Sequence, residues 1–146
     1  MDEITIHNKE EMDNVPNNFE GKIIIIDGED IIVRGNKRVE LYGHSSVKMY
    51  DSSKALMYNS STAEMHDLSK ALMHDNSSAK MYDYSSAKMY DSSSAILNDS
   101  SNAILNDSSS ACAHDLASFK IFDWAHVYYV YNSFKGIRLF KRGDLP

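Results

Sequence analysis

The chain has 146 residues, a formal net charge of −6 and a single cysteine, Cys112. This length fits one domain, and one cysteine excludes an internal disulfide and is typical of a reducing compartment such as the cytoplasm. No apolar run follows Met1-Asp-Glu, so we expect neither a secretory signal nor a membrane span. Residues 43–122 carry nine acids and six bases, and this charge balance argues against direct binding of nucleic acid.

The first expected element is a cap formed by residues 1–18. Ile4-Thr-Ile6 has the alternation of a short strand, and the polar stretch Asn8–Asn14 indicates a loop or a short helix before Pro16. A repeat protein needs such a segment, because an uncovered terminal strand pairs with other molecules. We therefore expect residues 1–18 to fold over the first coil.

The dominant feature is an eight-residue repeat that runs through residues 19–130 as fourteen octads without an insertion. Two clear copies are Asp91-Ser-Ser-Ser-Ala-Ile-Leu-Asn98 and Asp99-Ser-Ser-Asn-Ala-Ile-Leu-Asn106. Counted from the Asp, positions five and seven are apolar almost throughout, which predicts a short strand with those positions inward. The Asp or Asn and the serines that follow bond to nearby backbone groups and favour a corner. Each octad is therefore one strand and one corner.

A helix fits this repeat poorly, because a period of eight does not match about 3.6 residues per turn and the Asp-Ser-Ser runs are poor helix formers. An antiparallel meander normally uses glycine turns, and glycine is absent from residue 44 to residue 135. The sequence therefore predicts an all-β, single-domain parallel β-solenoid. Two and three octads per coil both remain open, because Leu68 and Leu116 break the serine pattern 48 residues apart, a multiple of sixteen and of twenty-four.

Residues 131–146 are the expected C-terminal cap. Aromatic residues concentrate around its start, and Val127–Tyr131 and Ile137–Phe140 are predicted to form a hairpin or a terminal strand pair.

Position eight of the octads offers a candidate binding surface. Tyrosine is enriched at protein interfaces, and stacked strands would bring the side chains of this position into an outward ladder. The corner aspartates offer a second candidate, because a row of them resembles a run of phosphates, although the strand lysines dilute that acid. The candidate partner-binding residues are Tyr50, Tyr58, His66, His74, Tyr82, Tyr90, Asp83, Asp91 and Asp99.

Cys112-Ala-His114-Asp115 holds the residue types of a nucleophilic site. The octad pattern explains the cluster structurally, because Asp115 is a corner Asp and no pocket-forming insertion accompanies the group. Histidines on stacked strands lie about 4.8 Å apart and point outward, whereas metal ligands converge at about 2 Å. We therefore expect no catalytic site, no metal and no cofactor.

The octads Gly43-His-Ser-Ser-Val-Lys-Met-Tyr50 and Asp83-Tyr-Ser-Ser-Ala-Lys-Met-Tyr90 resemble those of short-repeat β-solenoid proteins in bacterial and phage genomes, which are distantly similar to pentapeptide-repeat proteins. The resemblance covers residues 19–130 and implies this architecture. Such solenoids serve as decoys, inhibitors, scaffolds and surface proteins, so the likeness alone leaves the activity open.

The expected function is that of a non-enzymatic inhibitor or decoy from a phage or mobile element. Its partner would be a host protein that processes nucleic acid, such as a CRISPR effector or a restriction enzyme, in the cytoplasm of the host cell. The alternative is an assembly module that forms a homodimer through an end cap or a flat face. The outward aliphatic residues that favour this alternative are Leu56, Leu72, Ile96 and Ile104.

Overall fold

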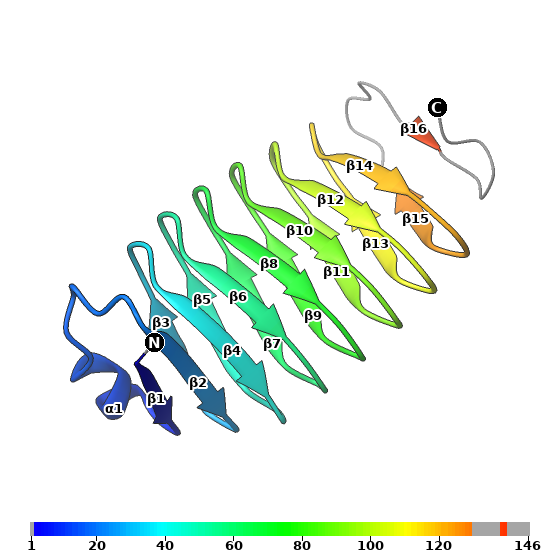
Figure 1. Cartoon of the computed structure of the whole chain (residues 1–146). Coiled ribbons are helices and arrows are strands. Elements are labelled where there is room, and N and C mark those ends of the chain that lie inside the picture. The colour runs from blue at the N-terminus through cyan, green and yellow to red at the C-terminus, as the bar shows by residue number, and fades with distance from the viewer. Residues whose placement is uncertain (1, 130–137, 140–146) are drawn as a thin grey trace.

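The computed structural model describes residues 2–129, 138 and 139, and it confirms an all-β parallel solenoid (Figure 1). Two octads form one coil, because each strand of the repeat pairs in parallel with the strand sixteen residues further on, as Ala87 does with Ala103. Consecutive strands therefore alternate between two sheets that pack face to face. The first sheet has the order β1-β2-β4-β6-β8-β10-β12-β14-β16, and the second has β15-β13-β11-β9-β7-β5-β3.

The strands of the first sheet are β1 (Glu3–Ile6), β2 (Lys22–Ile26), β4 (Arg38–Tyr42), β6 (Lys54–Met57), β8 (Lys70–Met73), β10 (Ser86–Met89), β12 (Asn102–Leu105), β14 (Ser118–Ile121) and β16 (Arg138–Leu139). The strands of the second sheet are β3 (Ile31–Val33), β5 (Ser46–Met49), β7 (Thr62–Met65), β9 (Ser78–Met81), β11 (Ser94–Leu97), β13 (Ser110–Ala113) and β15 (His126–Tyr129). One helix, α1 (Lys9–Asp13), follows β1.

The core lies between the two sheets and consists of octad positions five and seven, as predicted. Ala87 and Met89 are 5% and 0% exposed, and the equivalent Ala and Met side chains of neighbouring coils are buried in the same way. Small alanines and flexible methionines from both sheets fill the narrow space between them.

Serines at position three form a third inward column that the sequence analysis had placed only at the corners. Nine of them are fully buried: Ser45, Ser53, Ser61, Ser69, Ser77, Ser85, Ser93, Ser101 and Ser109. Where the hydroxyl is paired, it bonds to the carbonyl three residues earlier, as Ser85 Oγ does to the Tyr82 carbonyl at 2.7 Å. A small side chain that can satisfy its own hydroxyl fits where the strand enters the core.

The corners depend on aspartates with left-handed backbone. Asp or Asn at position one has φ between 54° and 59° in every octad from Asp51 to Asp123, and Gly35 and Gly43 take the same place in earlier coils. Asp and Asn tolerate this region better than other non-glycine residues. In addition, the Asp83 carboxylate accepts the backbone N–H of Asp67, sixteen residues earlier, at 3.1 Å. The corner aspartate therefore both turns the chain and links its coil to the preceding one.

The N-terminal segment packs against the first coil of the solenoid. Strand β1 pairs in parallel with β2, and α1 packs against β3 through the buried Met12. The Asn8 side chain accepts the Glu11 N–H and starts the helix. These contacts cover the unpaired edge of the first coil.

The predicted C-terminal hairpin is wrong for the residues described. Strand β15 pairs with β13 in the second sheet, whereas β16 pairs in parallel with β14 in the first sheet, Lys120 opposite Arg138. The chain therefore continues the alternation between sheets, which an antiparallel pair would have ended. The rest of the predicted cap, residues 131–137 and 140–146, lies outside the described residues, as does residue 130 at the end of the predicted repeat.

Candidate functional surfaces

Two faces and two edges make up the outside of the solenoid. The first face is the outer side of the first sheet, and the second face is the outer side of the second sheet. On both faces the side chains of octad positions four, six and eight point outward. The first edge holds the corners that lead from the first sheet to the second, with Asn59, Asp75, Asp91, Asp107 and Asp123. The second edge holds the opposite corners, with Asp51, Asp67, Asp83, Asp99 and Asp115.

The position-eight rings form two ladders, because alternate octads lie on opposite faces. On the first face Tyr42, Tyr58, His74 and Tyr90 stack with ring centroids 5.2, 5.4 and 5.1 Å apart. On the second face Tyr50, His66 and Tyr82 stack at 4.9 and 5.0 Å. The rings are half-buried against one another, so these predicted binding residues also stabilise the coil stack.

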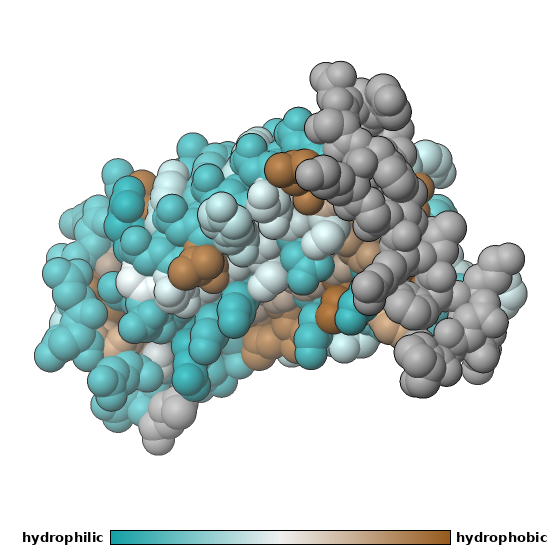
Figure 2. All heavy atoms as spheres, turned by 90° about the horizontal axis from the view of Figure 1, so that it is seen from above, coloured by the Kyte–Doolittle hydropathy of each residue, from teal (hydrophilic) through white to brown (hydrophobic). Residues whose placement is uncertain are grey.

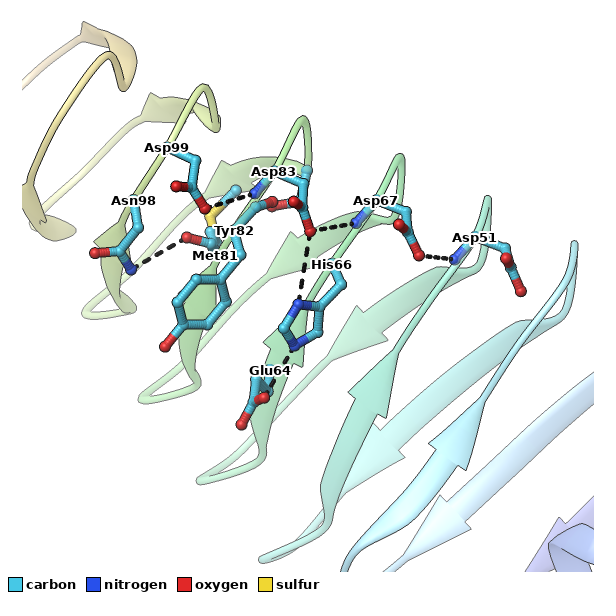
Figure 3. A network of polar contacts seen from close by, with 10 residues as sticks. Asp51, Glu64, His66, Asp67, Met81, Tyr82, Asp83, Asn98 and Asp99 are labelled. Carbon is cyan, nitrogen blue, oxygen red and sulfur yellow. Dashed lines mark hydrogen bonds and ion pairs between the residues drawn. The ribbon is translucent and has the colours of Figure 1, made fainter.

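Each ladder histidine lies beside acidic groups. His66 Nε2 is 2.9 Å from Glu64 Oε1 and its Nδ1 is 3.6 Å from Asp83 Oδ2, as Figure 3 shows. On the other face His74 Nδ1 is 3.4 Å from Asp91 Oδ2. The hydrogen bond from His66 lowers the pKa of the Glu64 carboxyl below its ordinary range.

The corner acids form straight rows along both edges. From Asp51 to Asp107, each corner side chain accepts the backbone N–H of the equivalent residue one coil earlier, and Figure 3 shows Asp51, Asp67, Asp83 and Asp99 linked in this way. The three candidate aspartates do not form one row, because Asp83 and Asp99 lie on the second edge and Asp91 lies on the first. The hydrogen bond to the backbone N–H uses one carboxylate oxygen, and the side chains of Asp83 and Asp91 remain 49% and 54% exposed.

The strand lysines do not neutralise the corner acids. They occupy positions four and six on the faces, and among residues 2–129 no Lys or Arg forms an ion pair with a corner carboxylate. The two edges differ in their surroundings. The first edge lies between the Tyr58–His74–Tyr90 ladder and a row of hydroxyls on the second face, formed by Ser46, Thr62, Ser78, Ser94 and Ser110.

The second edge instead borders a row of cations. Position four of the first face carries Lys22, Arg38, Lys54 and Lys70 in successive coils, and Ser86 and Asn102 continue the row. Outward strand residues of the first face from β2 to β14 include six cations and one acid, Glu40. The protein is acidic overall, so the two-octad coil has gathered a local excess of positive charge on this face.

Cys112 and His114 are adjacent on the second face, with Cys112 Sγ 3.5 Å from His114 Nε2, and Asp115 is exposed on the second edge. The side chains of Cys112 and His114 are half-buried. The Cys112 thiol lies in a shallow groove that Tyr128 also lines. Within the described ranges, no three His, Cys, Asp or Glu side chains are arranged to hold a metal ion. The described part of the chain also contains no helix long and apolar enough to cross a membrane.

Large hydrophobic side chains are exposed at a few corners. Leu68, Tyr84 and Leu116, at position two on the second edge, are 57%, 70% and 53% exposed, and Trp124 on the first edge is 75% exposed. Viewed from above, the solenoid surface is largely hydrophilic with separate hydrophobic spots (Figure 2). No protein-family model, curated protein or solved structure matches the chain.

Neither the cation row nor the absence of Lys and Arg from the described corners of the first edge was predicted from the sequence. Both follow from a sixteen-residue alternation at position four, where Arg38, Lys54 and Lys70 alternate with Ser46 and Thr62. This alternation was the available signal for two octads per coil.

Proposed function

We propose that the chain is a non-enzymatic inhibitor or decoy whose first edge imitates the phosphate row of a nucleic acid. One observation carries the proposal: Asp75, Asp91, Asp107 and Asp123 form a row of exposed carboxylates, and no Lys or Arg occupies the positions on either side of these corners. Within this function we propose an anti-CRISPR or anti-restriction role, because inhibitors and decoys are among the proteins that the repeat resembles.

The charge density of the edge supports this imitation. Coils of a parallel solenoid are about 4.8 Å apart, so each edge presents about one carboxylate per 4.8 Å of axis. One strand of duplex DNA presents about one phosphate per 3.4 Å. The row is thus about two thirds as dense as a phosphate strand. Because each Asp is held by a backbone N–H and a fixed corner, little ordering entropy is lost on binding.

The neighbouring side chains complete a nucleic-acid-like strip. Beside Asp75 and Asp91 lie the stacked rings of Tyr58, His74 and Tyr90, with centroids 5.4 and 5.1 Å apart, and on the other side lie hydroxyls such as Ser78. A basic groove that binds phosphates can pair its cations with the carboxylates, while the rings and hydroxyls on either side offer stacking and hydrogen-bonding groups. The expected partner is therefore a host enzyme with such a groove.

The experiment compares the two edges. The first-edge variant replaces Asp75, Asp91 and Asp107 by Asn, and the matched control replaces three aspartates of the second edge, Asp67, Asp83 and Asp99. Asn preserves the corner, because Asn59 has the same φ and accepts the Gly43 N–H at 3.0 Å. Both variants and the unaltered protein are used to capture proteins from a lysate of the host cell, with duplex DNA as competitor.

The expected capture is of nucleic-acid-binding enzymes that duplex DNA displaces. Three exposed charge contacts at roughly 0.5 kcal/mol each sum to about 1.5 kcal/mol, so the first-edge variant should bind about tenfold more weakly. The second-edge control should retain most of the affinity. Capture that resists duplex DNA, or equal binding by the first-edge variant, contradicts the proposal. Loss of binding with Tyr58→Ala and Tyr90→Ala alone would assign recognition to the aromatic ladder.

Self-association through a flat face is the second reading, and the arrangement of charges favours it less. Leu56, Leu72 and Ile104 lie together on the first face, whereas Ile96 lies on the second. Two first faces packed together would oppose cations such as Lys54 and Lys70, which disfavours a symmetric dimer there.

A further inference from the structure

The cations of the first face are mostly without acidic partners. Lys22 is paired with Glu3 at 2.9 Å and Glu40 at 3.5 Å. Arg38, Lys54 and Lys70, in the next three coils, are exposed, and none of the three has an ion pair within the described residues. A row of three unpaired cations on an acidic protein marks a site for an anionic group.

An aliphatic row runs parallel to these cations at position six. Leu56 and Leu72 lie in neighbouring coils, and Ile104 follows after Lys88. Between the two rows is a shallow groove whose floor is formed by the alanines of position five, and most of its lining is apolar. In the coils of Lys54 and Lys70 the groove thus has one cationic wall and one aliphatic wall, and it is bounded along the aliphatic row by Glu40 before Leu56 and by Lys88 after Leu72. This central part fits a ligand that is acidic on one side and apolar on the other.

The acidic edges limit the width of that ligand. The first face is about five residues of extended chain across, or roughly 17 Å, and a carboxylate row borders it on each side. A broad anionic surface, such as a membrane or a duplex, would place its charge within about 8 Å of both rows and be repelled. An α-helix with its side chains is about 10–12 Å wide and fits between them.

The spacing of the coils also favours a helix. Successive cations are about 4.8 Å apart along the solenoid axis. Successive turns of an α-helix are about 5.4 Å apart, whereas alternate residues of a strand are about 6.7 Å apart. A helix that lies along the groove can therefore keep one acid per turn opposite Arg38, Lys54 and Lys70, while its apolar side contacts Leu56 and Leu72.

We infer that the first face docks an acidic amphipathic helix of a partner protein. The helix lies along the solenoid axis, with its carboxylates on the position-four cations and its apolar stripe on the position-six aliphatic row. This site is separate from the first edge, so its test is independent of the proposed imitation of phosphates.

The test uses a synthetic peptide as the probe. A fluorescein-labelled helical peptide of about 14 residues, with one stripe of Glu beside one of Leu, spans about 21 Å, or four to five coils. The matched peptide carries Lys in place of Glu. The protein variant is Lys54→Gln with Lys70→Gln, and its control on the second face is Lys48→Gln with Lys80→Gln. Neutral residues are compatible with the fold, since Ser86 already occupies position four.

The acidic peptide should bind saturably, weaken as salt rises, and lose about fivefold or more in affinity with the Lys54/Lys70 variant, while the control variant stays within about twofold. No saturable binding up to about 1 mM peptide at low salt, equal binding of the Lys-bearing peptide, or an equal loss with the control variant would overturn the inference. Binding of phosphatidylglycerol vesicles through Lys54 and Lys70, with no binding of the peptide, would overturn it in favour of a lipid surface. Unchanged circular dichroism of each variant shows that the fold is kept.

Discussion

Replacement of Asp107 by Asn, Gly and Ala separates the two contributions of a corner aspartate. Its backbone is left-handed, with φ of 54°, and its carboxylate accepts the N–H of Asp91 at 3.1 Å. Ala in the left-handed region costs about 1–2 kcal/mol, and loss of an exposed hydrogen bond costs about 0.5–1 kcal/mol. Ala should therefore destabilise the protein by about 2 kcal/mol. The Gly variant loses the hydrogen bond but avoids the cost of a left-handed backbone. Because glycine also increases the entropy of the unfolded chain, this variant should destabilise the protein by about 1 kcal/mol.

Asn should cost less than about 0.5 kcal/mol, because it tolerates the backbone and keeps an acceptor oxygen. The assay is urea unfolding at neutral pH followed by far-ultraviolet circular dichroism, in which the midpoint should fall in the order Asn, Gly, Ala at constant slope. Ser92→Ala, at the exposed position two of another corner, is the control and should change little. An Ala variant as stable as the Asn variant would refute this account of the corners.

Three further predictions concern the faces. Ala87→Lys places a charge in the core and should unfold the chain or lower its melting temperature severely, whereas Lys88→Ala should be nearly neutral; equal effects on melting would mean that the inward and outward positions are reversed. Cys112→Ser and His114→Asn should leave melting and partner capture unchanged, and loss of capture at constant melting temperature would show that the pair has a functional role. The pKa of Glu64 is lowered in the folded protein, so the ionised carboxylate stabilises the fold above the ordinary glutamate pKa, and this stabilisation is lost as pH falls through the lowered value. The Glu64→Gln variant should therefore lose less stability than the unaltered protein below about pH 4. An acid unfolding curve identical to that of the unaltered protein would contradict this prediction.

The octad made the strand and corner of each repeat predictable, because alternation and turn chemistry are local properties. Ala87 and Met89 were correctly placed inside on this basis. The burial of the position-three serines was missed, because Ser normally indicates a surface corner. The constancy of that column, where position two varies through Leu68 and Tyr84, was the sign that it faces the core.

The candidate surfaces were predictable only in part, because they depend on which octads share a sheet. Tyr82 and Tyr90 were expected in one ladder but lie in different ones, since eight residues along the chain lead to the opposite face. The same half-coil separates Asp91 from Asp83 and Asp99. The number of octads per coil depends on which distant strands pair. The spacing of Leu68 and Leu116, the two leucines that interrupt the serine pattern, is compatible with both coil sizes and did not determine it.

The assignment of charge to edges and faces depends on a coil of two octads, and spin-label distances test that coil directly. In a Cys112→Ser background, nitroxides are attached to cysteines at two of the outward position-four sites. Labels at Asn102 and Ser118, which pair across β12 and β14, should show strong dipolar broadening. Labels at Asn102 and Ser110, on opposite sheets, should show none. Strong broadening between Asn102 and His126, twenty-four residues apart, with none between Asn102 and Ser118, would show three octads per coil and contradict the account.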